Sequence, residues 1–317
     1  MSRSLFGACV FLFCAAPALW AAVALPYGDE PGKVAFFNAN NHPEAEEPVP
    51  LGPLSFRVAR GECWVADSVA GRLYRLDDQG KLLKTLPVPK EGETILIEDI
   101  ALIKGANGQI EGIWVLEGGA QHVIRLSPEG EVVKTFGGRG DQPGQFIQMH
   151  RLEVGPDGRL FIADKGRQKI LIFAADGTFE REVPWQWSGL CLDAAGNLCR
   201  LWFDEAKKTT SLVIETPDGK PVKTVRLALG DHSDPELWCM NERGEACLTY
   251  VPATGFAGVF KFAVCGPDGQ TVQVVDLKPP LAMNRFLDRG EGTFFLGVAD
   301  YRAAPAGEFR IEPWTPH

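Results

Sequence analysis

Short apolar stretches, separated by polar turns that end in glycine, repeat along almost the whole chain. One set of these glycines follows the first strand of each repeat, 38 to 51 residues apart: Gly61, Gly112, Gly158, Gly196, Gly244 and Gly290. A second, interleaved set closes turns of the form acid-x-x-Gly or Pro-acid-Gly, 42 to 50 residues apart: Gly32, Gly80, Gly130, Gly177, Gly219 and Gly269. A repeat of about 40–50 residues with two hairpin turns is typical of a propeller blade. The pattern therefore predicts an all-β fold, a six-bladed β-propeller of four-stranded antiparallel blades.

The strand pattern is clearest in the third repeat. Its four expected strands lie at 150–154, 159–163, 169–173 and 178–183. The first of them is the inner strand, and inner strands are apolar nearly throughout because neighbouring blades cover both of their faces.

The two chain ends complement each other. The last repeat has a third strand at 308–314 but no fourth, and residues 33–38 (KVAFFN) show the missing pattern. We expect this N-terminal strand to complete the last blade and to close the ring, because closure removes two free sheet edges.

The third repeat and the linker before it resemble a known repeat family. Residues 136–146 read FGGRGDQPGQF, and residues 152–173 read LEVGPDGRLFIADKGRQKILIF. These segments are similar to the NHL repeat, with its Gly-rich linker that ends in Gly-x-Phe. Asp67 and Asp164 match the aspartate that follows the second strand of that repeat, Glu117 and Asp300 match it more loosely, and the fourth and fifth repeats depart from it. The resemblance implies the propeller fold and leaves the function open, because NHL-like propellers include sensor and adaptor domains, scaffolds and a few lyases.

The N-terminus has the pattern of a secretory signal peptide. Arg3 supplies the positive charge, residues 5–20 are apolar without acids, and Ala22-Val23-Ala24 is a small-x-small cleavage motif. A membrane anchor is the alternative, but the stretch is short and Pro17 interrupts it. We therefore expect a signal peptide at 1–24, a single propeller domain at 25–317, and a secreted or periplasmic product without a membrane span.

Composition narrows the range of partners. The chain of 317 residues has a formal net charge of −9 and is 45% hydrophobic. An acidic surface argues against nucleic acid as a partner, and also against an anionic membrane surface. We expect a monomer.

Four of the cysteines form two matching pairs. Cys191 and Cys199 flank the turn at Gly196, and Cys239 and Cys247 flank the equivalent turn one blade later. In a hairpin such residues face one another within disulfide reach, and an exported location permits oxidation. The sequence predicts the disulfides Cys191–Cys199 and Cys239–Cys247, with buried apolar thiols as the alternative. Cys63 and Cys265 are expected to be buried free thiols.

Several polar side chains are expected on one face of the propeller, the channel face, where the inner strands begin. They are Asp67, Asp99, Glu117, His150, Arg151, Asp164 and Asp300. Carboxylates gathered there suit a cation such as Ca²⁺ or a cationic ligand, whereas an Asp at a strand end also commonly accepts hydrogen bonds from loop N–H groups. The metal is not specified by any motif.

Two further residue types on this face suggest chemistry. His150 opens an inner strand and is the candidate acid or base, with a hydrogen-bonded structural histidine as the alternative. Trp187 precedes the inner strand of the fourth blade and suits a sugar or aromatic ligand, although core packing explains it equally well. Because no catalytic constellation is complete, we predict a non-enzymatic exported scaffold that binds a protein, peptide or glycan on its channel face. The alternative is a metal-dependent (Ca or Zn) hydrolase or lyase with an acidic site on that face.

Overall fold

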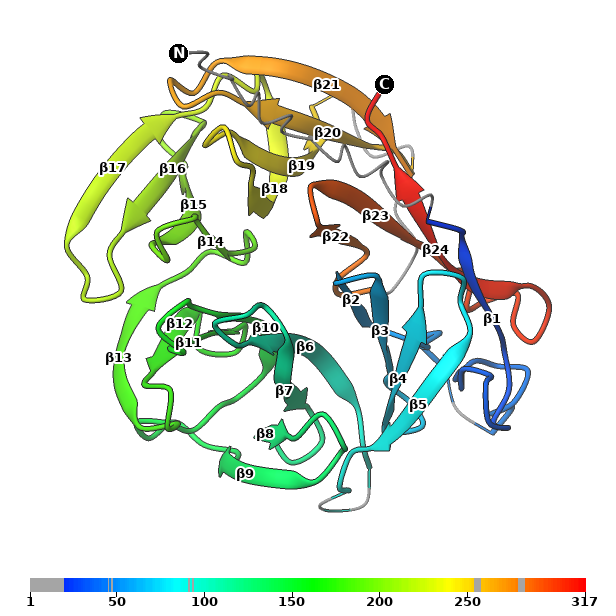
Figure 1. Cartoon of the computed structure of the whole chain (residues 1–317). Coiled ribbons are helices and arrows are strands. Elements are labelled where there is room, and N and C mark those ends of the chain that lie inside the picture. The colour runs from blue at the N-terminus through cyan, green and yellow to red at the C-terminus, as the bar shows by residue number, and fades with distance from the viewer. Residues whose placement is uncertain are drawn as a thin grey trace, which may run out of the picture.

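Six four-stranded antiparallel sheets form a closed ring in the described part of the chain (Figure 1). The computed structural model describes residues 20–44, 46, 48–90, 92, 94–253, 258–278 and 283–317. The predicted six-bladed β-propeller is therefore confirmed. None of the described segments forms a helix of the length and apolar character that a membrane span requires.

Each blade is a simple up-and-down sheet with its first strand nearest the ring axis. Blade one consists of β2 (Ser55–Ala59), β3 (Glu62–Asp67), β4 (Arg72–Asp77) and β5 (Leu82–Pro87). Blade two consists of β6 (Ile97–Lys104), β7 (Ile110–Glu117), β8 (His122–Leu126) and β9 (Val132–Gly137). Blade three consists of β10 (Met149–Val154), β11 (Leu160–Asp164), β12 (Lys169–Phe173) and β13 (Phe179–Pro184).

The second half of the ring follows the same order. Blade four consists of β14 (Cys191–Leu192), β15 (Leu198–Asp204), β16 (Thr209–Glu215) and β17 (Pro221–Arg226). Blade five consists of β18 (His232–Met240), β19 (Ala246–Pro252), β20 (Phe260–Cys265) and β21 (Thr271–Leu277). Blade six consists of β22 (Leu287–Gly290), β23 (Thr293–Val298), β24 (Glu308–Trp314) and, from the other end of the chain, β1 (Val23–Pro26).

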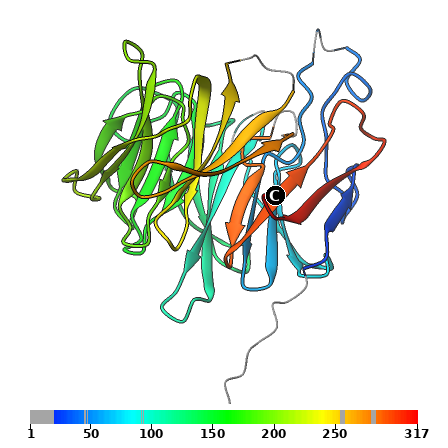
Figure 2. The ribbon, with the colours of Figure 1, turned by 90° about the horizontal axis from the view of Figure 1, so that it is seen from above.

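The ring closes through an N-terminal strand, as predicted, but through a different segment. β1 pairs with β24, with Val23 opposite Ile311 and Leu25 opposite Phe309. The blue β1 and the red β24 lie side by side in Figure 1 and Figure 2. The prediction that residues 33–38 form the closing strand is wrong. The alternating pattern of β1 buries Val23 and Leu25 in the core, whereas 33–38 follows the turn at Gly32 and is already on the long connection back to blade one.

The position of β1 bears on the predicted signal peptide. Residues 1–19 lie outside the described residues, but Val23 and Ala24 belong to β1. Cleavage after Ala24 stays a prediction, and it would remove the first half of the strand that closes the ring.

Apolar clusters between adjacent blades hold the ring together. Trp64 packs with Ile100 and Ile113 between blades one and two, and Trp114 packs with Phe173 and Leu152 between blades two and three. These side chains are at most 2% exposed. Burial of such large side chains is the main source of stability in a fold of this kind.

Blades four and five are the least regular, and both carry a cysteine pair. The inner strand β14 has only two residues, and β18 is interrupted by two register shifts. Cys191 lies directly opposite Cys199, and Cys239 directly opposite Cys247. All four are free thiols in the structure, and their oxidation to disulfides stays a prediction. Cys63 and Cys265 are buried, as expected.

Candidate functional site

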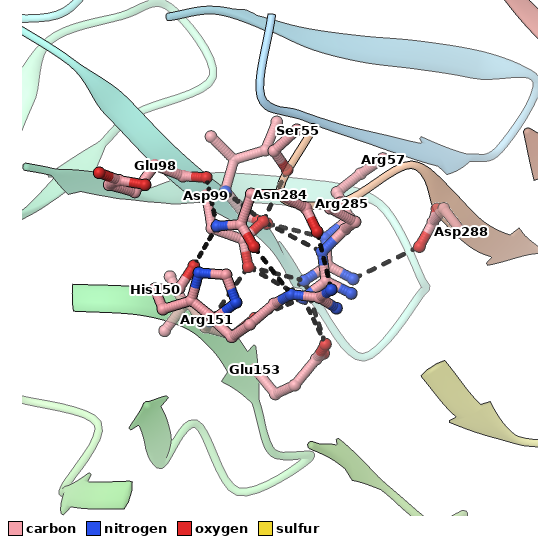
Figure 3. Close-up of polar contacts among 12 residues, drawn as sticks. Ser55, Arg57, Glu98, Asp99, His150, Arg151, Glu153, Asn284, Arg285 and Asp288 are labelled. Atoms are coloured by element: carbon pink, nitrogen blue, oxygen red, sulfur yellow. Dashed lines mark hydrogen bonds and ion pairs between the residues drawn. The ribbon is translucent and has the colours of Figure 1, made fainter. Parts of the chain in front are cut away.

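A network of buried charges crosses the ring axis (Figure 3). At its centre, the fully buried carboxylate of Asp99 accepts hydrogen bonds from Ser55 Oγ at 2.6 Å, Arg285 Nε at 3.0 Å and Arg285 Nη2 at 2.9 Å. Burial alone would raise the pKa of Asp99, but the charges of Arg285 and Arg57 outweigh it and hold the pKa below its ordinary value. Asp99 is therefore an ionised structural anchor.

Two more arginines extend this network around the axis. Arg57 donates to the backbone oxygens of Ile100 at 2.7 Å and Leu152 at 2.8 Å. Arg151 donates to Asn284 Oδ1 at 3.0 Å, forms an ion pair with Glu236, and lies 4.3 Å from the ring centre of Trp238. We call this set the axial network: Ser55, Arg57, Asp99, Arg151, Glu153, Glu236, Asn284, Arg285 and Asp288. Buried charges require such partners, and these link blades one, two, three, five and six.

Beside the network, β6 and β10 each begin with a β-bulge. The pairing register of β6 shifts between Ile97 and Asp99, so Glu98 is the extra residue. The register of β10 shifts between Met149 and Arg151, so His150 is the extra residue at the equivalent position one blade later. A bulge redirects a side chain away from the regular alternation of its strand, and bulges are frequent beside active sites.

One amide holds the two bulges together. Asn284 Nδ2 donates to the backbone oxygen of Glu98 at 2.9 Å and also to the backbone oxygen of His150. Asn284 Oδ1 accepts from Arg151, so the axial network fixes the orientation of this amide. In Figure 3 the side chain of Glu98 points away from the network's contacts. The network thus fixes the backbone of both bulges through Asn284. Among the described residues, it makes no hydrogen bond to the side chain of Glu98 or His150.

Lys165 completes a group that we call the Glu98 trio: Glu98, His150 and Lys165. Lys165 follows β11, and its N–H donates to the Gln148 oxygen at 2.8 Å beside the His150 bulge. All three side chains are half-buried. Within the described part of the chain, none of the three makes a side-chain hydrogen bond or ion pair, although the charge of Lys165 acts on both of the others.

The environment shifts the pKa of every member of the trio. Burial raises the pKa of Glu98 to about 7, with Asp99 and Glu117 adding to the rise and Lys165 opposing it. Burial, together with the charges of Arg151 and Lys165, lowers the pKa of His150 well below its ordinary value. Burial also lowers the pKa of Lys165. Near neutral pH, Glu98 thus changes between acid and carboxylate while His150 is neutral.

Two tryptophans flank the trio. Trp185 is buried, and its ring centre lies 6.0 Å from that of His150. Trp187 is 55% exposed, and its Nε1 donates to the backbone oxygen of Lys165 at 3.0 Å. Its backbone φ of +58° is uncommon for a bulky residue, and such conformations gather at ligand sites. Trp187 therefore presents a fixed aromatic surface next to Lys165.

The structure separates the predicted site residues into two groups. Asp99, His150 and Arg151 come together at the axis, and Trp187 contacts the backbone of Lys165. Four other carboxylates each accept hydrogen bonds from loop N–H groups. Those N–H donors belong to Ala35 for Asp67, Gly119 and Ala120 for Glu117, Ile147, Gln148 and Arg167 for Asp164, and Arg302 and Ala303 for Asp300. Among the described residues, no group of three or more His, Cys, Asp or Glu side chains is arranged to hold a metal ion. The expected calcium ligands thus do not converge.

Sequence reasoning missed Glu98, Lys165, Glu236 and Arg285. Glu98 and Lys165 each adjoin a residue that was identified, Asp99 and Asp164 respectively. The signal in the sequence was this adjacency, at the start of β6 for Glu98 and just after β11 for Lys165. Strict alternation along a strand gives no reason to select Glu98.

A second concave region lies between blades four and five. This groove of about 830 Å³ is lined by Lys207, Lys208, Lys223, Arg226, His232 and Asp268, among others. Lys207 and Lys208 pair with Asp204 and Glu205 on the same turn, so much of the positive charge is already neutralised. The groove therefore offers a weaker case for a site than the trio does.

The class of protein is a six-bladed β-propeller, and comparison with known structures supports that class. The chain resembles a streptogramin B lyase structure (TM-score 0.52, 17% identity, 83% of this chain and 94% of that one). It also resembles virginiamycin B lyase from Staphylococcus aureus (0.51, 16%, 83% and 84%) and a glucose dehydrogenase (0.50, 14%, 84% and 97%).

Identities this low show the fold alone. No protein-family model matches the chain, and the search of curated proteins gives no match. Membership of the NHL-repeat family therefore stays a prediction.

Proposed function

We propose that this protein is an exported binding propeller that recognises a peptide or glycan at the Glu98 trio. The observation that carries the proposal is the pair of bulges at Glu98 and His150, which lie at equivalent positions on β6 and β10. Among the described residues, neither of these side chains nor that of Lys165 makes a hydrogen bond or an ion pair. Half-buried polar groups without partners are costly to a folded protein unless water or a ligand satisfies them. Trp187 adds the flat apolar surface that peptide side chains and sugar rings pack against.

A binding screen with matched variants tests this function. Purified protein is titrated with a panel of short peptides and neutral oligosaccharides, with tryptophan fluorescence and calorimetry as readouts. We expect a ligand whose affinity falls at least tenfold in Lys165→Met and in Trp187→Ala. Lys104→Met, an exposed lysine at the far end of β6, is the control and should bind as the wild type does. A ligand whose affinity neither Lys165→Met nor Trp187→Ala changes would place the site elsewhere.

The pKa values of the trio favour one second candidate, an acid–base enzyme. A carboxyl group with a pKa of about 7 and a neutral imidazole, each on a bulge at the start of an inner strand, are suited to exchange protons with a substrate near neutral pH. The test is turnover of ester, lactone and amide panels by wild type and by Glu98→Gln. Activity that Glu98→Gln abolishes while ligand affinity persists would favour this candidate over simple binding.

A further inference from the structure

The outer strand of blade four, β17, has a free edge. Among the described residues it pairs with β16 alone, and it lies on the outside of the ring in Figure 1. The backbone N–H groups of successive residues in an antiparallel strand point to opposite sides. Leu227 N–H donates inward to an oxygen of β16 at 2.8 Å, and Ala228 N–H donates outward to Gly269 of blade five at 2.9 Å. By this alternation, Thr224 and Arg226 direct their N–H and C=O groups outward.

Blades one and three protect the same place on their outer strands, and blade four does not. The last residue of the outer strand is Pro87 in β5 and Pro184 in β13, but Arg226 in β17. The three places are equivalent, because the next residue in each blade donates its N–H inward at 2.8–2.9 Å. Proline has no N–H for an incoming strand and is a common protection of sheet edges. Arg226 keeps its N–H, so β17 lacks this protection.

The groove between blades four and five lies beside this edge. Residues 223–228 form one part of its lining, and the volume is about 830 Å³. The charged residues of the lining are four lysines or arginines and two aspartates: Lys207, Lys208, Lys223, Arg226, Asp231 and Asp268. Lys223 donates to the backbone oxygen of Pro267 at 2.6 Å, and neither Lys223 nor Arg226 forms an ion pair among the described residues. In a chain of net charge −9, this locally basic groove favours a negatively charged ligand.

Charge alone would make the groove a weak site, and the free strand edge beside it specifies the kind of ligand. An extended peptide carries N–H and C=O groups with the same alternation as β17, whereas a polysaccharide has no such ladder. A second copy of this chain would place its own basic edge opposite the first, and like charges facing one another across two strands are unfavourable. An acidic peptide segment therefore fits the edge and the groove together.

We propose that an extended, acidic segment of a partner protein adds to β17 as a fifth strand of blade four. Thr224 and Arg226 supply its backbone hydrogen bonds, and the basic groove supplies the preference for Asp and Glu side chains. This inference goes beyond the proposed function and does not depend on it, because β17 is on the outside of the ring and the Glu98 and His150 bulges are on inner strands.

Peptide selection with a proline variant tests strand addition. A random ten-residue library is selected against the purified full chain, and the enriched peptides are synthesised and titrated by calorimetry. We expect peptides rich in Asp and Glu whose affinity falls about tenfold or more in Arg226→Pro. The sister strands β5 and β13 already carry proline at this place, so the variant is compatible with the fold, and thermal melting checks it. Asp276→Pro, at the same register position of β21, is the control and should bind as the wild type does.

An N-methyl scan of the best peptide reports on the backbone hydrogen bonds themselves. Methylation should abolish binding at every second residue, where the peptide N–H faces β17, and should be tolerated between them. Arg226→Gln, which loses the charge and keeps the N–H, should bind more weakly than wild type but more tightly than Arg226→Pro. Loss at every position or at none would contradict a strand ladder.

Three other outcomes would overturn the inference. A dimer in gel filtration that Arg226→Pro converts to a monomer would assign the edge to a second copy of the chain. Oligogalacturonate that binds wild type and Arg226→Pro equally, but Lys223→Gln more weakly, would make the groove a site for acidic glycans. Selected peptides that bind Arg226→Pro as tightly as wild type would not use this edge, and if Lys165→Met weakened them they would belong to the Glu98 trio instead.

Discussion

The sharpest stability prediction concerns Asp99, the centre of the axial network. In Asp99→Asn the carboxylate charge disappears while the shape is kept, and Arg285 is left with Glu153 at 2.9 Å as its remaining carboxylate. Removing one partner of a buried ion pair typically costs about 3–5 kcal/mol. Because Glu153 retains part of the attraction, we expect the lower end, about 3 kcal/mol. In a domain of this size that corresponds to a fall in Tm of roughly 6–12 °C.

Urea unfolding followed by tryptophan fluorescence measures this cost, with the slope m used to confirm a common unfolded state. Arg285→Met and the double variant complete a double-mutant cycle. We expect the double variant to lose less than the sum of the two single losses, by at least about 1 kcal/mol, because the second change removes a charge that the first left unpaired. Asp276→Asn, at the exposed ion pair with Lys261, is the control and should cost less than about 1 kcal/mol. A cost for Asp99→Asn as small as the control's, or strictly additive losses, would refute the reasoning.

Three other results are expected. Deletion through Pro26 removes β1 and the burial of Val23 and Leu25, so it should cost about 3–6 kcal/mol and promote aggregation through the free edge of β24, as read by melting and gel filtration; unchanged melting would exclude β1 as the closing strand. Peptide mapping of exported protein should find both predicted cysteine pairs cross-linked, with reduction costing about 2–3 kcal/mol per bridge; alkylation of all six thiols without reductant would contradict this. The raised pKa of Glu98 means that the folded state holds the Glu98 proton to higher pH than the unfolded state does. As the pH rises from about 4.5 to 7, the stability should therefore fall in the wild type and fall less in Glu98→Gln. Parallel pH profiles of Tm for the two proteins would show that Glu98 does not titrate in this range.

The repeat pattern predicted the architecture because it is a local property of the chain. Alternating and continuous apolar stretches identify strands, and the glycines between them identify the hairpin turns. The same reasoning placed Asp99, His150 and Arg151 at the starts of inner strands, and they do lie there. It failed for the closing strand, because the segments on both sides of the Gly32 turn are apolar. The two segments are distinguished by pairing with the outer edge of β24, which β1 makes and residues 33–38 do not.

The candidate site was harder to predict because two of its residues break the strand pattern. Glu98 and His150 are bulge residues, and a bulge depends on how a strand pairs with its neighbour rather than on its own sequence. The repeated aspartates, which the sequence made most visible, accept hydrogen bonds from loop N–H groups. Repetition favoured that outcome, since a residue that recurs in several blades is better explained by a loop contact that those blades share.

The sequence by itself determined the all-β class, the number of blades, the hairpin positions and the facing cysteines, because each depends on contacts between residues that are close along the chain. The tertiary structure decided what those blades bring together. Asn284 joins two bulges that precede it in the chain by 186 and 134 residues, and Arg285 reaches Asp99 across the axis. These partners meet only when the ring closes, since closure places the starts of the inner strands around one axis, where Asn284 holds the Glu98 and His150 bulges together.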